Sequence, residues 1–193
     1  LLTRVIFGIR TTVIITLASL VTGSLVLGVG FGLVSGYFGK WIDSVIMRVG
    51  EIFLAFPGIF LVLIIAATVR PRVLESVRNF EDATGIDWII RLGIVDYIVV
   101  FGALSAFSWV GMARLVRGQV LVLKENQFVE AAKAAGASTG RVLAVHVMPN
   151  ILGPIIVLVS MGMGATAGSE IILSWLGIGI QPPTPSLGVM IFE

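Results

Sequence analysis

Four apolar stretches of membrane-spanning length most constrain how this chain can fold. They cover residues 11–34, 52–69, 97–113 and 147–167. A helix needs roughly 20 mostly apolar residues to cross a hydrocarbon core about 30 Å thick, because each residue advances the chain by about 1.5 Å. The sequence therefore predicts an all-α integral membrane protein with about four full spanning helices.

The composition agrees with a chain that is largely surrounded by lipid. Hydrophobic residues make up 57% of the 193 residues and charged residues only 12%, and the mean hydropathy is +1.06. A soluble domain carries about 25% charged residues, so too few polar side chains remain here to cover one. The net charge of +2 is too small an excess to argue for nucleic-acid binding.

Catalytic and metal-binding residue types are scarce in the sequence. It contains no cysteine, which excludes thiolate metal sites and cysteine catalysis, and its one histidine, His146, excludes a multi-histidine metal site. No G-x-x-x-x-G-K-[ST] sequence occurs, so we expect ATP to be bound by another chain. The sequence predicts no catalytic residue, no metal site and no cofactor bound by this chain.

Two polar segments, residues 70–96 and 114–146, must lie outside the hydrocarbon, since each charge would cost a few kcal/mol inside it. The single span between them puts them on opposite sides. Lys and Arg are almost equally numerous on the two sides, so their distribution does not identify the cytoplasmic one. The first segment is expected to include a short amphipathic helix near residues 73–80.

Prolines interrupt the apolar pattern at two places. Pro57 should kink the second span, because proline lacks a backbone N–H, and the kink serves either gating or packing. A fifth apolar stretch, residues 171–180, is too short to span and runs into Pro182, Pro183 and Pro185. We expect it to form a short re-entrant or external segment.

Small and sulfur-containing residues inside the spans suggest packing and a pathway. Gly28, Gly32 and Gly36 recur every four residues and share one helix face, which is typical of close helix packing. A phosphate-binding glycine loop is the alternative, but no strand precedes these residues and the spacing differs. Candidates for a translocation pathway, with ordinary packing as the alternative, are Ser160, Met161 and Met163.

The sharpest local pattern is NQFVEAAKAAGAST, residues 126–139. Asn126 suits a helix N-cap, the next nine residues are strong helix formers, and Gly136 suits a left-handed stop before a second helix capped by Ser138 or Thr139. One face of the first helix would carry Phe128, Ala131, Ala132 and Ala135, flanked by Glu130 and Lys133. Such a helix fits either a partner's groove or the membrane surface.

This pattern resembles the E-A-A-x-x-x-G-x9-I-x-L-P motif of ABC importer permeases. Glu130, Ala131, Ala132, Gly136 and Pro149 match it, while His146 and Met148 replace its Ile and Leu. Further segments narrow the resemblance to the second permease subunit of dipeptide, oligopeptide and nickel importers: RVIFGIRTTVIITLASL, GYFGKWIDSVIMRVGEIFLAFP, WVGMARLVRGQVL and SEIILSWLGIGIQPPTPSLG. Residues 70–96 are longer than the usual loop at that place in the family.

The resemblance implies a type I ABC importer transmembrane domain, with residues 1–193 as one domain that lacks a first and a last helix. It implies that residues 114–146 are a cytoplasmic coupling loop, that residues 70–96 are extracytoplasmic, and that Leu1 and Glu193 also lie outside. The family's ATPase-docking role would fall on Phe128, Glu130, Ala131, Ala132, Ala135 and Gly136.

The same resemblance implies a non-enzymatic permease in a bacterial or archaeal cytoplasmic (inner) membrane that imports di- or oligopeptides. Its partners would be a second permease subunit, two ATPase subunits that hold ATP and Mg, an extracytoplasmic solute-binding protein and the lipid bilayer. A nickel or other small-solute importer remains an alternative. A self-contained channel or secondary transporter is another, but it needs ionisable residues deep in the spans, and only Glu170, near a span end, is a candidate.

Overall fold

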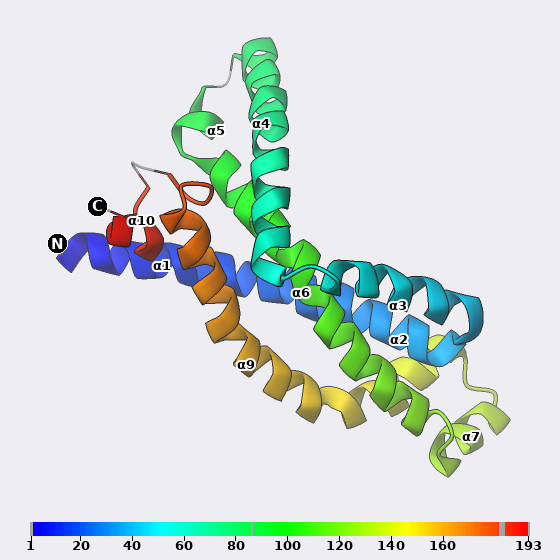
Figure 1. The fold of residues 1–193 in the computed structure, drawn as a ribbon. Helices are drawn as coiled ribbons and strands as arrows, with labels where there is room; N and C mark the ends of the chain where they lie inside the picture. Colours follow the sequence, from blue (N-terminus) through cyan, green and yellow to red (C-terminus); the bar gives the residue numbers. More distant parts are fainter. Residues whose placement is uncertain (1, 86, 182–183, 193) are drawn as a thin grey trace.

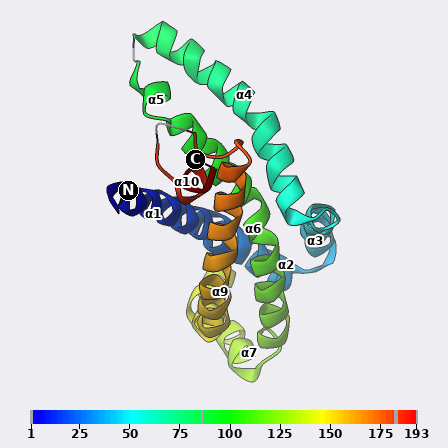
Figure 2. The same cartoon turned by 60° about the vertical axis from the view of Figure 1, so that its left-hand side comes forward.

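The computed structural model describes residues 2–85, 87–181 and 184–192, and within these ranges the chain is helical apart from short turns, with no strand. The predicted all-α fold is confirmed. α5 (Trp88–Arg91) and α7 (Gln127–Ala134) lie at opposite ends of an elongated molecule (Figures 1 and 2), which we call the α5 end and the α7 end. The predictions for Leu1, Pro182, Pro183 and Glu193 fall outside the described residues.

The first apolar stretch forms one continuous helix of 37 residues, Leu2–Phe38. Its parts are α1 (Leu2–Ser19), the π-helical segment η1 (Leu20–Gly28) and α2 (Val29–Phe38). At about 1.5 Å per residue the helix is about 55 Å long, well beyond a hydrocarbon core of about 30 Å. The predicted span is therefore the central part of a longer helix.

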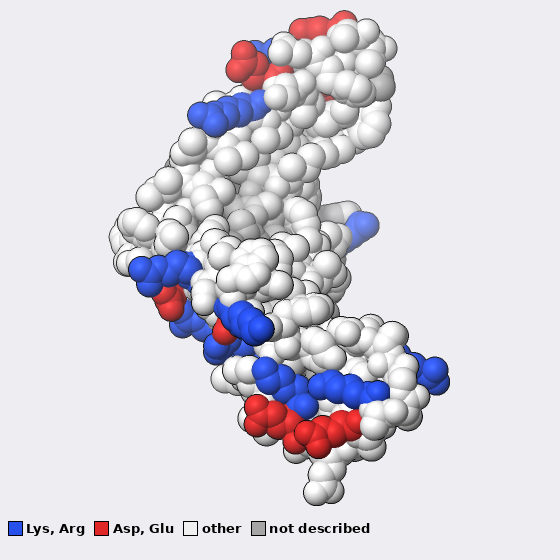
Figure 3. Space-filling model, turned by 90° about the vertical axis from the view of Figure 1, so that its right-hand side faces the viewer, with Lys and Arg blue, Asp and Glu red and all other residues white. Residues whose placement is uncertain are grey.

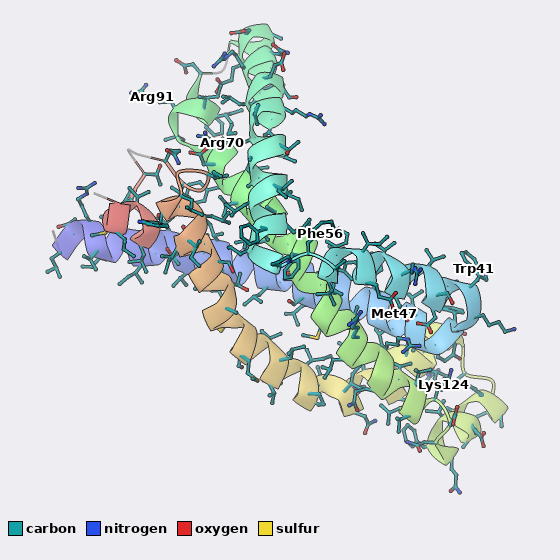
Figure 4. The ribbon with its side chains drawn as sticks, in the orientation of Figure 1. Trp41, Met47, Phe56, Arg70, Arg91 and Lys124 are labelled. Atoms are coloured by element: carbon teal, nitrogen blue, oxygen red, sulfur yellow. The ribbon has the colours of Figure 1, made fainter. Side chains whose placement is uncertain are left out.

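The second apolar stretch is broken rather than continuous. α3 (Lys40–Leu54) and α4 (Gly58–Thr84) are bent by 91° at the residues between them, and Figure 4 labels Phe56 at this bend. Pro57 causes the break, because it lacks an N–H and disfavours helical geometry in the preceding residue. One uninterrupted helix over residues 52–69 is therefore wrong, and the kink expected at Pro57 is confirmed.

α4 continues through Pro71 to Thr84, so most of the segment predicted as a loop, residues 70–96, is helical. The polar residues that follow Pro71 are mainly good helix formers, and polarity excludes them from lipid without preventing a helix. The amphipathic helix expected at residues 73–80 lies within α4. Gly85, with a left-handed φ of +71°, ends α4.

α6 (Ile94–Leu123) is the central helix and carries more of the buried apolar side chains than any other described helix. It runs in the same direction as the first helix and crosses it at an angle, as Figure 1 shows. A Cβ added to Gly28 would lie 2.6 Å from Cβ of Met112, and one added to Gly32 would lie 2.6 Å from Cβ of Val116. Gly36 meets Val120 in the same way, at 2.7 Å. The face that carries these three glycines thus packs directly on α6.

The last long helix also has 37 residues, Thr139–Trp175. It consists of α8 (Thr139–Arg141), the π-helical segment η2 (Val142–Val147) and α9 (Met148–Trp175). The fifth apolar stretch is divided: its first half completes α9, and its second half forms a turn in which Gly177 has a φ of +75°. The short helix α10 (Leu187–Phe192) then packs back against α9.

By length and apolar composition, three described helices can cross a membrane: Leu2–Phe38, Ile94–Leu123 and Thr139–Trp175. The bent pair α3 and α4 makes a fourth if it counts as one broken span. On the face shown in Figure 3, one group of charged residues lies at the top of the molecule and a second is spread from its middle to near the bottom, with an uncharged zone between the two groups. This arrangement agrees with the predicted four spans and with a multi-pass membrane protein.

Candidate functional site

α7 is an exposed helix that one buried side chain attaches to the rest of the chain. Val129 is fully buried and packs with Val142 and Val147, while Ala132 packs against the edge of the same cluster. Sequence reasoning missed Val129. The available signal was its spacing of three residues from Ala132, which puts both on the side of the helix that faces the core.

Gly136 ends α7 in the left-handed conformation expected from the sequence, with a φ of +82°. The N–H of Gly136 donates to the carbonyl of Lys133 at 2.9 Å, and the N–H of Ala137 donates to the carbonyl of Ala132 at 3.0 Å. These two bonds form a Schellman motif. Asn126 and Ser138 occupy the two N-cap positions with extended backbone, although neither side chain makes a capping hydrogen bond in the described structure.

The predicted docking residues lie together on the outer surface of α7, apart from Ala132, which is half-buried. Phe128 is 41% exposed. The other exposed members of the predicted set are Glu130, Ala131, Ala135 and Gly136. The result is an aromatic side chain beside small residues and one carboxylate, a surface that another protein can approach closely.

Two lysines connect this region to the end of the first helix. Lys133 on α7 places Nζ 5.4 Å from the ring centroid of Tyr37, a cation–π contact with α2. Lys124, labelled in Figure 4 at the end of α6, donates from Nζ to the carbonyl of Gly36 at 3.2 Å. α7 and the end of α6 are therefore both in contact with the end of α2.

A polar cluster joins α2, α3 and α6 near the same end. Arg117 donates from two nitrogens to the two carboxylate oxygens of Asp43, and Ser35 donates to one of them. Asp43 and Arg117 line a cavity together with the exposed pair of Arg48 and Glu51, whose closest atoms are 3.3 Å apart. No pattern in the sequence predicted the cluster around Asp43.

At the α5 end, residues 70–96 fold into a defined unit. The guanidinium of Arg70 lies 2.9 Å from the carboxylate of Asp96, which also accepts the backbone N–H of Gln181 at 3.3 Å. Glu81 accepts the backbone N–H groups of Ile89 and Ile90, at 2.8 and 3.0 Å. Its carboxylate thereby caps the first turn of α5.

Glu170 is fully buried between α1 and α9. Thr12 donates to one of its carboxyl oxygens at 2.7 Å and Ser174 donates to the other at 2.8 Å. One oxygen is therefore bound by the neighbouring helix α1 and the other by a residue one turn further along α9. This arrangement fits a tie between two helices better than a group that exchanges ions with a pathway.

The predicted pathway residues lie apart from α7, on the exposed side of α9. Met161 is 72% exposed and Met163 is 41% exposed, while Ser160 donates to the carbonyl of Ile156 in its own helix. Their role in a pathway stays a prediction. Among the described residues, no group of three or more His, Cys, Asp or Glu side chains could hold a metal ion.

Known proteins resemble this chain over nearly all of its length. The dipeptide transport system permease protein DppC of Alkalihalophilus pseudofirmus is 37% identical over 191 residues, which is 99% of this chain and 55% of that protein. DppC of Lactococcus lactis is 34% identical over 188 residues, covering 97% of this chain and 48% of that protein. The glutathione transport system permease protein GsiD of Pectobacterium atrosepticum is 33% identical over 190 residues, covering 98% of this chain and 55% of that protein.

This chain therefore spans about half the length of the curated relatives it matches. The sequence pattern of one protein family matches residues 28–193, a range that includes α6, α7 and all of the last long helix. With most of its length matched in this way, the chain belongs to the family of binding-protein-dependent transport system inner membrane components.

Proposed function

We propose that this chain is a permease subunit of an ATP-driven importer of di- or oligopeptides, with ATP hydrolysed on separate subunits. The observation that carries the proposal is α7, an exposed helix that Val129 anchors to a buried apolar cluster formed with α6 and α9. The peptide substrate rests on the printed names of the relatives, two of which are dipeptide permeases and one a glutathione permease.

In this proposal the α7 end faces the cytoplasm and the α5 end faces the outside. Two ATPase subunits hold ATP and Mg, and one of them receives the Phe128 side of α7. A solute-binding protein delivers substrate near residues 70–96 and 171–186. A second permease subunit forms the other half of the pathway in a bacterial or archaeal cytoplasmic membrane, and the apolar surface that α9 leaves exposed supports such a neighbour.

ATP acts by stabilising one arrangement of the ATPase pair over another, and the permease follows. When the ATPases close, they move α7. Because Lys133 touches Tyr37 and Val129 is packed against the α6–α9 cluster, the movement reaches the spanning helices. These helices then tilt between inward-open and outward-open states, as packed helices that move together do.

The test is co-purification of the full-length protein with its candidate ATPase subunits in detergent. Glu130→Lys combined with Gly136→Trp changes the docking surface and its turn. Glu75→Lys combined with Gly85→Trp is the matched control at the α5 end, because Gly85 also has a positive φ and open space around it. We expect the ATPases to remain with wild type and the control, and to be lost from the α7 variant. Retention by the α7 variant would contradict the proposal.

A further inference from the structure

A cavity of about 250 Å³ lies among four helical segments in the middle of the apolar zone. It is bordered by η1, the beginning of α4, the middle of α6 and the middle of α9. It is separate from α7 and from the exposed residues Ser160, Met161 and Met163. Nothing in the proposed docking mechanism uses it.

The walls of this cavity combine apolar side chains with four hydroxyl groups. The hydroxyls belong to Ser24, Ser108, Thr166 and Ser169, and none of the described lining residues is charged. Ser24 donates to the carbonyl of Ser108 at 3.2 Å, and Ser169 donates to the carbonyl of Ala165 at 2.9 Å. Each of these hydroxyl oxygens keeps lone pairs that can accept an N–H.

This chemistry selects an uncharged guest. An amide N–H finds acceptors here, and a small apolar group finds apolar walls. An ammonium or carboxylate would find no opposite charge among the described lining residues, and an unpaired charge in such a site is strongly unfavourable.

The backbone around the cavity is irregular on two of its sides. η1 is a π-helical segment, and α4 starts at the 91° bend that follows Pro57. π-Helical segments and interrupted spanning helices are frequent at functional sites in membrane proteins. The bend also brings Gly58 against the ring of Phe107, where an added Cβ would clash, so the close approach of α4 and α6 at the cavity wall requires glycine.

We propose that this cavity binds a backbone amide and a small uncharged side chain of a peptide as the peptide passes this subunit. The inference rests on the proposed function in peptide import. The cavity is smaller than the roughly 300–1,000 Å³ of sites that enclose a drug-sized ligand, so it holds one part of a peptide while the charged termini stay outside it.

The first test measures protection of a single cysteine in the complete, otherwise cysteine-free transporter. Thr166→Cys lies in the cavity wall, and Ala167→Cys is the matched control, half-buried like Thr166 but outside the lining. N-Ethylmaleimide is the label and dialanine the ligand, with binding protein and ATP present. At about ten times the half-saturating dialanine concentration, labelling of Thr166→Cys should slow about tenfold, because only the unoccupied fraction reacts.

Labelling of Ala167→Cys should be unaffected by dialanine. Equal labelling rates at Thr166→Cys with and without dialanine, in a transporter that imports dialanine, would overturn the cavity inference and leave the proposed function standing. Absence of ATP-driven dialanine uptake by the wild-type transporter would overturn the proposed function, and the cavity inference with it.

The second test fills the cavity. Ala165→Phe places a ring inside it, and Ala167→Phe is again the control. We expect the KM for dialanine uptake to rise about tenfold or more for Ala165→Phe. The added ring takes up space that the bound part of the peptide needs, and steric differences of this size in a pocket change substrate selection by about that factor. The ATPases should still co-purify with the variant. An unchanged KM would contradict the inference, and a variant that fails to assemble leaves the labelling result as the deciding one.

Discussion

Arg117 on α6 binds both carboxylate oxygens of Asp43 on α3, although 74 positions separate the two residues in the sequence. Ser35 on α2 donates to the same carboxylate, so three helices meet at one group. Asp43 lies just after Gly39 and Lys40, both of which have positive φ at the corner between α2 and α3. The ion pair therefore fixes the direction in which α3 runs from the corner between α2 and α3.

Loss of this pair should destabilise the protein more than loss of an exposed pair. The Asp43 and Arg117 side chains are 17% and 34% exposed, so removal of either one would leave the largely buried charge of the other unpaired. Asp43→Asn or Arg117→Met should lower the free energy of unfolding by about 1–3 kcal/mol. Thermal unfolding in detergent, read as a double-mutant cycle, should give a clear coupling energy.

The control for this cycle is Arg48 and Glu51, whose side chains are 80% and 52% exposed. Their coupling energy should lie within about 1 kcal/mol of zero, since solvent screens an exposed pair. Equal coupling energies for the two pairs would show that the contact between Asp43 and Arg117 does not fix the corner.

Local features of this fold were predictable from the sequence, because each depends on neighbouring residues. The helix formers after Asn126 and the glycine at position 136 specify where α7 begins and ends. The spacing of Gly28, Gly32 and Gly36 predicted that they share one helix face. It did not predict that α6 is the helix that packs on this face. The contact between Asp43 and Arg117 left no pattern, since its partners are brought together only by helix packing.

The length of α4 was misjudged because polarity was taken as the end of a helix. Charged residues after position 69 indicate where lipid ends, whereas helix propensity decides where the helix ends. Gly85 was the true stop signal, as its positive φ shows. The 91° bend was equally beyond prediction, since Pro57 specifies a break but not its angle.

Gly32 should not tolerate alanine. A Cβ at this position would lie 2.6 Å from Cβ of Val116, so the first helix and α6 would have to move apart. Overpacking of this kind costs about 1–3 kcal/mol. Gly32→Ala should lower the melting temperature in detergent clearly, whereas Gly30→Ala, with no atom within 4 Å of its added Cβ, should not. Equal tolerance at both positions would argue against the close packing of these helices.

Gly136 should be needed for its backbone conformation rather than for space. Its φ is +82° and no atom lies within 4 Å of an added Cβ. Gly136→Ala should cost about 1–2 kcal/mol, the penalty for a side chain in the left-handed region. Amide hydrogen exchange should then be faster in α7. Gly140→Ala, at the second residue of α8 and also in open space, should leave exchange in α7 unchanged.

Glu170 on α9 should tie this helix to α1 through the hydrogen bond that it accepts from Thr12. Glu170→Ala leaves the buried hydroxyls of Thr12 and Ser174 without this acceptor, and each unsatisfied group costs about 1–3 kcal/mol. Glu170→Gln keeps an acceptor oxygen and the side-chain shape, so it should be much less destabilising. Thermal unfolding and expression level would compare the two variants. A similar loss in both would mean that the negative charge, and not the hydrogen bonding, matters at this position.

The contact between Lys133 and Tyr37 should transmit movement from α7 more than it holds the ATPase. An exposed cation–π contact contributes about 0.5–1 kcal/mol, and Tyr37 lies on α2, away from the outer surface of α7. Tyr37→Leu should therefore leave ATPase co-purification nearly unchanged, while fewer peptides are imported per ATP hydrolysed in proteoliposomes. Phe38→Leu is the neighbouring control, because Phe38 is half exposed and only touches Tyr37 edge-on. If Tyr37→Leu kept the wild-type ratio of peptide to ATP, the coupling path would have to run through Val129 and its buried neighbours on α6 and the last long helix.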